Sequence, residues 1–161
     1  MITIDEFMTS EPFTLRETDT IDDAWKVMTE KHIRHIPVTD VDNHLLGLVT
    51  QRDILAATGP DGASYDGNSG VKLSEIMMRE VSSIHTSGSL RMAAMYLQSH
   101  KYGCLPVMSD ERLVGIITDS DFITIAINLL EQAELAEEEV GAIDDVIDDI
   151  DLEMPEFEGD L

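Results

Sequence analysis

The sequence predicts an α+β fold in which one β-α-β-β-α unit is used twice. The heptapeptide Gly-x-x-Thr-x-x-Asp follows an apolar run twice, at residues 47–53 and 115–121. Upstream, the two copies correspond at a spacing of 69 residues, as Ala24 and Ala93 do. The spacing becomes 68 after a one-residue deletion in the second copy, opposite Asn43. Because such a repeat describes the whole fold, any site is expected in two versions.

Local sequence patterns in the first repeat predict its strands and helices in order. They are a short strand at 12–15, a helix at 21–31, strands at 36–39 and 45–50, and a second helix from about residue 52. Thr20 is the expected N-cap of the first helix, with Asp23 three residues later in a near capping box. The apolar residues of this helix recur at the spacing of one helical face, at Ile21, Ala24, Trp25 and Met28.

The second repeat follows the same order, with Ser89 as the helix cap. Repeats of roughly 60 residues are marginal alone, so we expect the two to fold against each other. The segment 59–70 contains four glycines and a proline, which favours a flexible connector, with a lid over a ligand as the alternative. The expected organisation is repeat 1 at 1–58, linker 59–70, repeat 2 at 71–130 and an acidic tail at 131–161.

The net charge of −23 is unevenly distributed. Residues 113–161 carry 16 acidic and no basic side chains, whereas residues 1–112 carry 17 acidic and 10 basic ones, a net of −7. Phosphate-rich nucleic acids and anionic membrane surfaces are therefore not expected partners. Cys104 is the only cysteine, which excludes an internal disulfide. The sequence shows neither a signal peptide nor an apolar run long enough to span a membrane, so we expect a cytoplasmic protein.

Several paired motifs resemble a tandem CBS-domain pair, or Bateman module. The entry motifs are Glu6-Phe7-Met8 and Glu75-Ile76-Met77, and the mid-repeat motifs are His35-Ile36-Pro37-Val38 and Cys104-Leu105-Pro106-Val107. Together with the two heptapeptides they cover about residues 2–130. The resemblance implies two repeats packed about a pseudo-two-fold axis, two clefts that bind adenosine-containing ligands, and a homodimer. AMP, ADP, ATP and S-adenosylmethionine are the candidate ligands, and no cofactor is required.

The Thr and Asp of each heptapeptide are expected on the first turn of a helix, where unpaired N–H groups favour anions. The carboxylate can accept from both ribose hydroxyls, although each Thr-Asp pair can equally be a helix cap. The candidate ligand-binding residues are Arg34, His35, Ile36, Pro37, Thr50, Arg52 and Asp53 in the first repeat and Leu105, Pro106, Thr118 and Asp121 in the second. No catalytic group or metal site is predicted.

The two clefts are expected to differ in their affinity for phosphate. In the family, a basic residue before the Pro-Val strand often neutralises phosphate. Arg34 and His35 occupy that place in the first repeat, where Arg52 adds a further cation, whereas the second repeat has Gly103 and Cys104 there. We therefore expect the Asp53 cleft to bind phosphate better. The Asp121 cleft is expected to be empty or suited to adenosine-like or cationic ligands. Alternatively, Arg34 and His35 make only surface ion pairs or hydrogen bonds.

The acidic tail supports two interpretations. Its composition is typical of disorder, but its apolar residues follow a 3-4 spacing that is typical of an amphipathic helix docking on a partner. They are Ala133, Ala136, Val140, Ile143, Ile147, Ile150, Met154 and Phe157. Gly141 and carboxylate repulsion oppose the helix. Cation binding by the paired aspartates is a weaker alternative.

The predicted function is ligand sensing by a regulatory, non-enzymatic protein that forms a homodimer and acts on an unknown protein partner. The alternative is a dimeric interaction protein with vestigial clefts that works through its acidic, apolar-striped tail. Thermal stabilisation by a ligand distinguishes the two classes.

Overall fold

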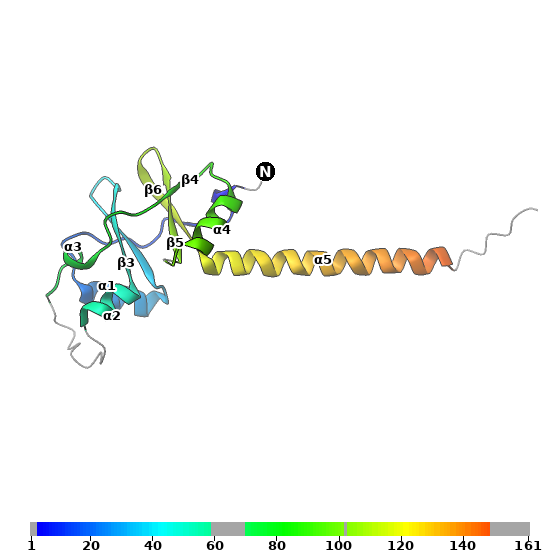
Figure 1. The fold of residues 1–161 in the computed structure, drawn as a ribbon, viewed down its shortest axis with the longest axis horizontal. Helices are drawn as coiled ribbons and strands as arrows, with labels where there is room; N and C mark the ends of the chain where they lie inside the picture. Colours follow the sequence, from blue (N-terminus) through cyan, green and yellow to red (C-terminus); the bar gives the residue numbers. More distant parts are fainter. Residues whose placement is uncertain (1–2, 59–69, 102, 149–161) are drawn as a thin grey trace, which may run out of the picture. The chain divides into compact units, whose positions relative to one another are not determined.

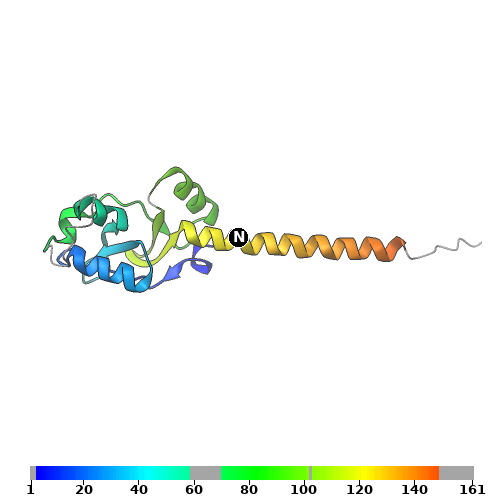
Figure 2. The same ribbon diagram turned by 90° about the horizontal axis from the view of Figure 1, so that it is seen from below.

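A computed structural model describes residues 3–58, 70–101 and 103–148, with side chains described to residue 142 (Figures 1 and 2). The chain divides after Phe122 into two compact units. The first unit contains the first repeat and the second repeat as far as Phe122, and the second unit begins at Ile123 within the last helix. Within the described residues, no helix is long and apolar enough to cross a membrane.

Each repeat contains a short helical turn at its start and a β-hairpin between two longer helices. The first repeat comprises η1 (Ile4–Glu6), β1 (Thr9–Ser10), α1 (Ile21–Lys31), β2 (His35–Thr39), β3 (Leu45–Thr50) and α2 (Gln51–Thr58). The second comprises α3 (Leu73–Ile76), β4 (Ile84–His85), α4 (Leu90–Ser99), β5 (Cys104–Ser109), β6 (Arg112–Thr118) and α5 (Asp119–Asp148). The α+β fold and the helix at 21–31 are confirmed. The strand predicted at 12–15 is wrong, because only Leu15 pairs there, in an isolated bridge to Val38.

Helix α1 begins with the predicted capping box. The backbone N–H and hydroxyl of Thr20 both donate to Asp23 Oδ2 at 2.9 Å, and the Asp23 N–H donates back to Thr20 Oγ1 at 3.3 Å. These bonds, from the Thr20 backbone first and its side chain second, lower the pKa of Asp23 below its ordinary value of 3.8. The carboxylate form therefore stabilises the folded state above that pH, and this contribution is lost as the pH falls through the lowered pKa.

Asp23→Asn is expected to lower the free energy of unfolding by about 0.5 kcal/mol at neutral pH, a small effect because the pair is exposed to solvent. The difference from wild type should shrink at an acidic pH below the lowered pKa of Asp23, where the wild-type side chain is itself protonated. Urea unfolding of both proteins at the two pH values measures this. A difference that stays the same at acidic pH would contradict a role for the ionised carboxylate.

The entry segment of each repeat packs into the core of the other. Ile4, at the start of the first repeat, is fully buried with Ala93, Leu105, Val107 and Ile117 of the second. Conversely, Leu73 and Met77 of the second repeat are buried in the core that α1, β2 and β3 form. This exchange explains why two small repeats fold as one unit: neither core is complete without the other repeat's entry segment.

Strand pairing repeats in the two halves at the spacing of the sequence. One sheet has the order β1-β6-β5-β4, with Thr9 opposite Ile116 and Ile84 parallel to Val107. In the other half, the β2-β3 hairpin is flanked by two bridges, Met78 with Leu48 and Leu15 with Val38. These bridges lie 69 or 68 residues from their counterparts, so the same four-strand arrangement occurs twice. The third cluster of buried residues, Leu48, Cys104 and Ile116, contains members of both repeats.

The residue at which the repeat register changes has a structural role. Asn43 lies in the turn between β2 and β3 with a left-handed φ of 67°, which asparagine tolerates better than most residues. Its carbonyl accepts from the N–H of Leu113 at 3.0 Å, and its side-chain amide donates to the Leu113 carbonyl. The extra residue of the first repeat therefore links its turn to β6 of the second.

Candidate ligand-binding clefts

The Thr and Asp of each heptapeptide form a helix cap at the junction between a strand and the following helix. The backbone N–H of Thr50 donates to Asp53 Oδ2 at 2.8 Å and its hydroxyl does so at 2.9 Å. Thr118 donates to Asp121 Oδ2 in the same way, at 2.7 and 3.2 Å. In both pairs the described bonds use Oδ2 alone, which leaves the capacity of Oδ1 to accept from a ligand.

This cap is not by itself a ligand site. Thr20 and Asp23 make the same bonds at α1, away from the residues that line either pocket described below. A Thr-x-x-Asp pair thus also serves as a plain helix cap that satisfies unpaired N–H groups at the helix start. What distinguishes Asp53 is its surroundings, since it borders a pocket and Asp23 does not.

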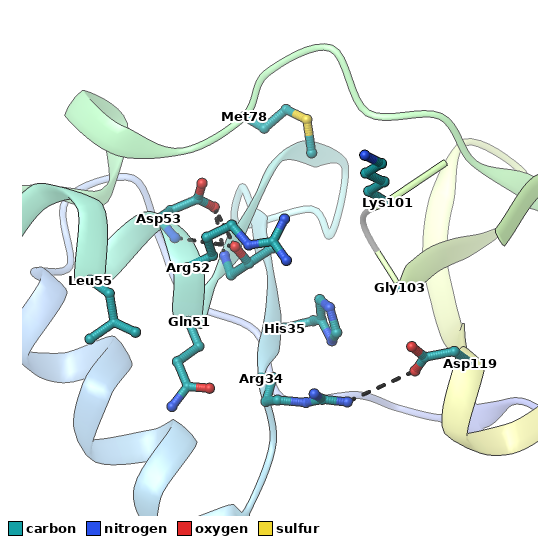
Figure 3. Close-up of a pocket in the computed structure, with 11 residues that line it drawn as sticks. Arg34, His35, Gln51, Arg52, Asp53, Leu55, Met78, Lys101, Gly103 and Asp119 are labelled. Atoms are coloured by element: carbon teal, nitrogen blue, oxygen red, sulfur yellow. Dashed lines mark hydrogen bonds and ion pairs between the residues drawn. The ribbon is translucent and has the colours of Figure 1, made fainter. Parts of the chain in front are cut away.

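The first pocket has a volume of about 430 Å³ and contains the predicted first-repeat residues Arg34, His35, Thr50, Arg52 and Asp53 (Figure 3). The second repeat contributes Met78, Lys101, Gly103 and Asp119 to its wall. Among the described lining residues three cations face two carboxylates, a net charge of +1 in a protein of −23. This local excess of cations favours an anionic ligand.

The second pocket has the same volume, about 430 Å³, and opposite charge. Thr118, Asp119 and Ser120 at the start of α5 line one side, and the segment from Thr9 to Phe13 lines another. Ser120 stands where the first repeat has Arg52. In the described part of the chain, the charged residues that line this pocket are Glu11, Arg34 and Asp119, and their charges sum to −1. A neutral or cationic ligand suits it better than a phosphate.

Arg34 and His35 lie between the two pockets and line both. The sequence assigned them to the Asp53 cleft, and the structure places them at the other cleft as well. The reason is that the residues preceding the two Pro-Val strands meet: a Cβ added to Gly103 would lie 3.4 Å from His35 Nε2 and 3.2 Å from Asp119 Oδ2. Arg34 makes an ion pair with Asp119 at 4.0 Å, in agreement with the surface-pair alternative.

The remaining predicted residues do not border either pocket in the described part of the chain. Four are buried strand residues of the two hairpins, Ile36, Pro37, Leu105 and Pro106. Asp121 caps α5 but is not among the residues lining the second pocket. Lys101 and Met78 line the first pocket and were missed, because both come from the second repeat.

Cys104 is a core residue. It is 2% exposed and packs with Leu48 and Ile116. Burial first, and the nearby Asp119 and Asp121 carboxylates second, raise the pKa of its thiol far above the ordinary range. The thiolate that a nucleophile requires is therefore disfavoured.

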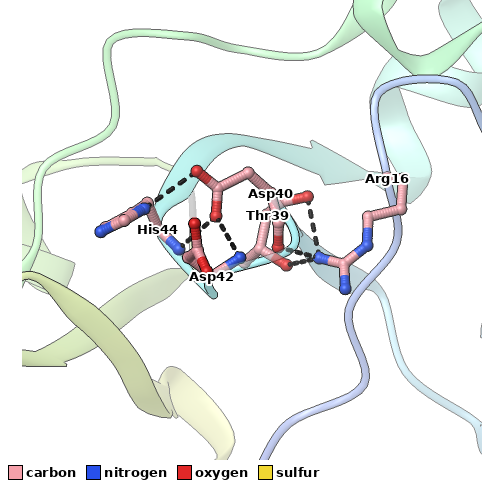
Figure 4. Close-up of polar contacts among 5 residues, drawn as sticks. All are labelled: Arg16, Thr39, Asp40, Asp42 and His44. Atoms are coloured by element: carbon pink, nitrogen blue, oxygen red, sulfur yellow. Dashed lines mark hydrogen bonds and ion pairs between the residues drawn. The ribbon is translucent and has the colours of Figure 1, made fainter.

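A turn in the first repeat brings three potential metal ligands within 4.8 Å of one another, Asp40, Asp42 and His44 (Figure 4). Asp40 Oδ1 accepts from the N–H groups of Asp42 and His44 at 2.9 Å, and Oδ2 lies 2.9 Å from His44 Nδ1. The bonds from His44, backbone first, lower the pKa of Asp40. These hydrogen bonds within the turn explain why the three side chains lie close together.

Comparison with known proteins identifies the repeats. The model of the CBS domain matches residues 4–59 and 73–128. The chain is 47% identical to a Vibrio cholerae protein named for acetoin utilization (AcuB), over 83% of this chain and 98% of that chain, with a TM-score of 0.74. It is 26% identical to CBSX2 from Arabidopsis thaliana, solved in complex with AMP, over 80% and 98% of the two chains, with a TM-score of 0.70.

A curated enzyme shares the same region. Homoserine O-acetyltransferase from Methanocorpusculum labreanum is 33% identical over 118 residues, which are 73% of this chain and 23% of the enzyme. The chain thus spans about a quarter of the length of that relative. With both repeats matched by the family model and the paired fold shared with solved relatives, the chain belongs to the CBS-domain family as a tandem pair of CBS domains.

Proposed function

We propose that this CBS pair is a regulatory module that binds an adenine nucleotide in the first pocket, with AMP, ADP and ATP as candidates. The observation that carries the proposal is the combination of Asp53 with three cations, Arg34, Arg52 and Lys101, around one pocket. Asp53 Oδ1 accepts from the ribose hydroxyls, and the cations neutralise the phosphate. The AMP complex of CBSX2, a relative with the same paired fold, supports this ligand class.

The second pocket takes a different ligand in this proposal. Its lining charges of −1 suit adenosine itself or the sulfonium of S-adenosylmethionine better than a phosphate. The two pockets, which lie in similar repeats, thus bind ligands of different charge.

Binding in the first pocket joins the two repeats. Arg52 and Asp53 belong to the first repeat, whereas Lys101 and Gly103 belong to the second. A ligand that contacts both stabilises one relative position of the repeats, and a protein partner senses the difference. The module acts without catalysis of its own, and the expected homodimer presents this surface to the partner.

The proposal is tested by isothermal titration with AMP and S-adenosylmethionine after a thermal-shift panel. A ligand at about 100 times its Kd should stabilise the fold by roughly 2.7 kcal/mol. Asp53→Ala should weaken AMP binding about tenfold or more, because a charge-assisted hydrogen bond is lost, while Asp121→Ala should leave it nearly unchanged. Asp23→Ala is the matched control, since it removes the same kind of cap outside both pockets.

Two results would contradict the proposal. Equal losses in Asp53→Ala and Asp121→Ala would remove the asymmetry between the pockets. The absence of any thermal shift with the whole panel would favour the interaction protein instead. Helix α5 supports that alternative with exposed apolar side chains, namely Ile123, Ile127, Leu129, Leu130, Leu135 and Val140.

A further inference from the structure

We propose that Arg34 couples the two pockets: it exchanges Asp119 for the phosphate of a bound ligand, so that anionic ligands in the two pockets weaken each other's binding. This inference rests on the proposed function, because it requires ligands in both pockets. It assigns a regulatory role to the Arg34–Asp119 ion pair, a role that goes beyond the binding of a single ligand.

The first observation is that the two pockets share residues. Among the described lining residues, Arg34, His35 and Asp119 border both pockets. The three come from the two repeats. Gly103 lies close to the side chains of His35 and Asp119, and Asp119 in turn pairs with Arg34. A movement of one of these side chains therefore changes the charge distribution in both pockets.

The second observation is that the Arg34–Asp119 pair is weak. The guanidinium nitrogen and the Asp119 Oδ1 oxygen are 4.0 Å apart, and the two side chains are 61% and 55% exposed. Exposed ion pairs at such distances contribute little, and a phosphate is a better partner for a guanidinium than one distant carboxylate oxygen. A phosphate in either pocket can therefore displace Asp119.

One guanidinium cannot neutralise phosphates in both pockets at full strength. Once Arg34 has turned to a phosphate in the first pocket, Glu11 and Asp119 remain as the charged lining residues of the second. A second phosphate then binds more weakly, by about two- to fivefold, which is what an exposed pair contributes. A cationic ligand there binds more tightly by a similar factor, because Arg34 no longer offsets the charge of Asp119, whose Oδ1 keeps the hydrogen bond from the Ser120 N–H. The sign of the coupling thus depends on ligand charge.

The test uses two variants that block one pocket each with a bulky side chain. Ser10→Trp blocks the second pocket and Leu55→Trp the first, since Ser10 lines only the second and Leu55 only the first. Titration of AMP into each gives the affinity of the other pocket alone. In the wild type, the second AMP should then bind about two- to fivefold more weakly than the single-pocket affinities predict. Adenosine, which lacks the phosphate, should show additive binding.

The outcomes separate the two proposals. AMP binding that is additive in the wild type overturns the coupling and leaves the proposed function standing. If AMP occupies the first pocket alone, saturating AMP should tighten S-adenosylmethionine binding in the second pocket about two- to fivefold, and an unchanged affinity would overturn the coupling. No binding of AMP or adenosine to any of the proteins overturns both. Circular dichroism of the two tryptophan variants establishes that they are folded.

A second measurement does not require the two tryptophan variants. Asp119→Asn should tighten AMP binding about two- to fivefold, partly by releasing Arg34 and partly by removing a carboxylate from the pocket wall, and the gain should be smaller in an Arg34→Gln background. Glu17→Gln is the matched control: it makes the same change of charge and breaks an exposed pair with Arg79 that measures 2.8 Å. A gain from Asp119→Asn that is equally large in Arg34→Gln would overturn the proposal.

Discussion

Leu73→Ala is expected to lower the free energy of unfolding by about 2–5 kcal/mol, and to weaken the first repeat although Leu73 belongs to the second. Leu73 is fully buried in the core that contains Ile21 and Ile36. Its truncation removes transfer free energy and leaves a cavity in that core. Such a loss is a large fraction of the stability of an ordinary domain.

The only tryptophan makes this prediction measurable. Trp25 packs against the same core, so its fluorescence follows the first repeat, while far-UV circular dichroism follows both. In urea, the Trp25 transition of Leu73→Ala should move to lower concentration together with the dichroism transition. Leu130→Ala is the control, since Leu130 is 62% exposed in the second unit. A Trp25 transition that keeps its wild-type midpoint would show that the repeats are independent.

The exchange of entry segments marks the limit of what the sequence predicts about the fold. Helical periodicity and the Thr20 and Ser89 caps are local signals, and both helices begin where these caps predict. Ile4 and Leu73 stand at equivalent positions, two residues before the glutamate of each entry motif. The sequence does not show in which repeat each side chain is buried, since both cores consist of similar apolar residues. The strand predicted at 12–15 was wrong for a related reason. A strand requires a neighbour, and only Leu15 finds one.

For the candidate site too, the sequence predicts what local spacing determines and misses what depends on contacts between the repeats. The sequence predicted Thr50 and Asp53 because their spacing defines a helix start, and these residues do border a pocket. It missed Lys101 because this lysine reaches the pocket from the other repeat. It also assigned Arg34 to one cleft, because sequence proximity says nothing about a residue that lies between two.

Gly47→Ala is expected to destabilise the fold by about 1–3 kcal/mol, and Gly115→Ala by clearly less, although the two glycines are equivalent in the repeats. A Cβ on Gly47 would lie 2.8 Å from the backbone oxygen of Met78. That oxygen is fixed, because Met78 and Leu48 exchange two backbone hydrogen bonds of 2.9 Å. The three atoms nearest to a Cβ on Gly115 all belong to the side chain of Met8, and a methionine side chain can adopt another rotamer.

The comparison of the two glycines separates backbone contact from the ordinary effect of replacing a strand glycine. Alanine restricts the unfolded chain equally at both positions, and neither glycine has the positive φ that would strain alanine. Gly141→Ala, where a Cβ meets nothing within 4 Å, provides a position without a clash. Urea unfolding of the three variants should place Gly47→Ala lowest in stability. Because Met78 also lines the first pocket, the same variant should bind AMP more weakly than Gly115→Ala does. Equal stability of the two variants would mean that the Met78 backbone yields, and that the exchanged entry segment is held less firmly than its hydrogen bonds indicate.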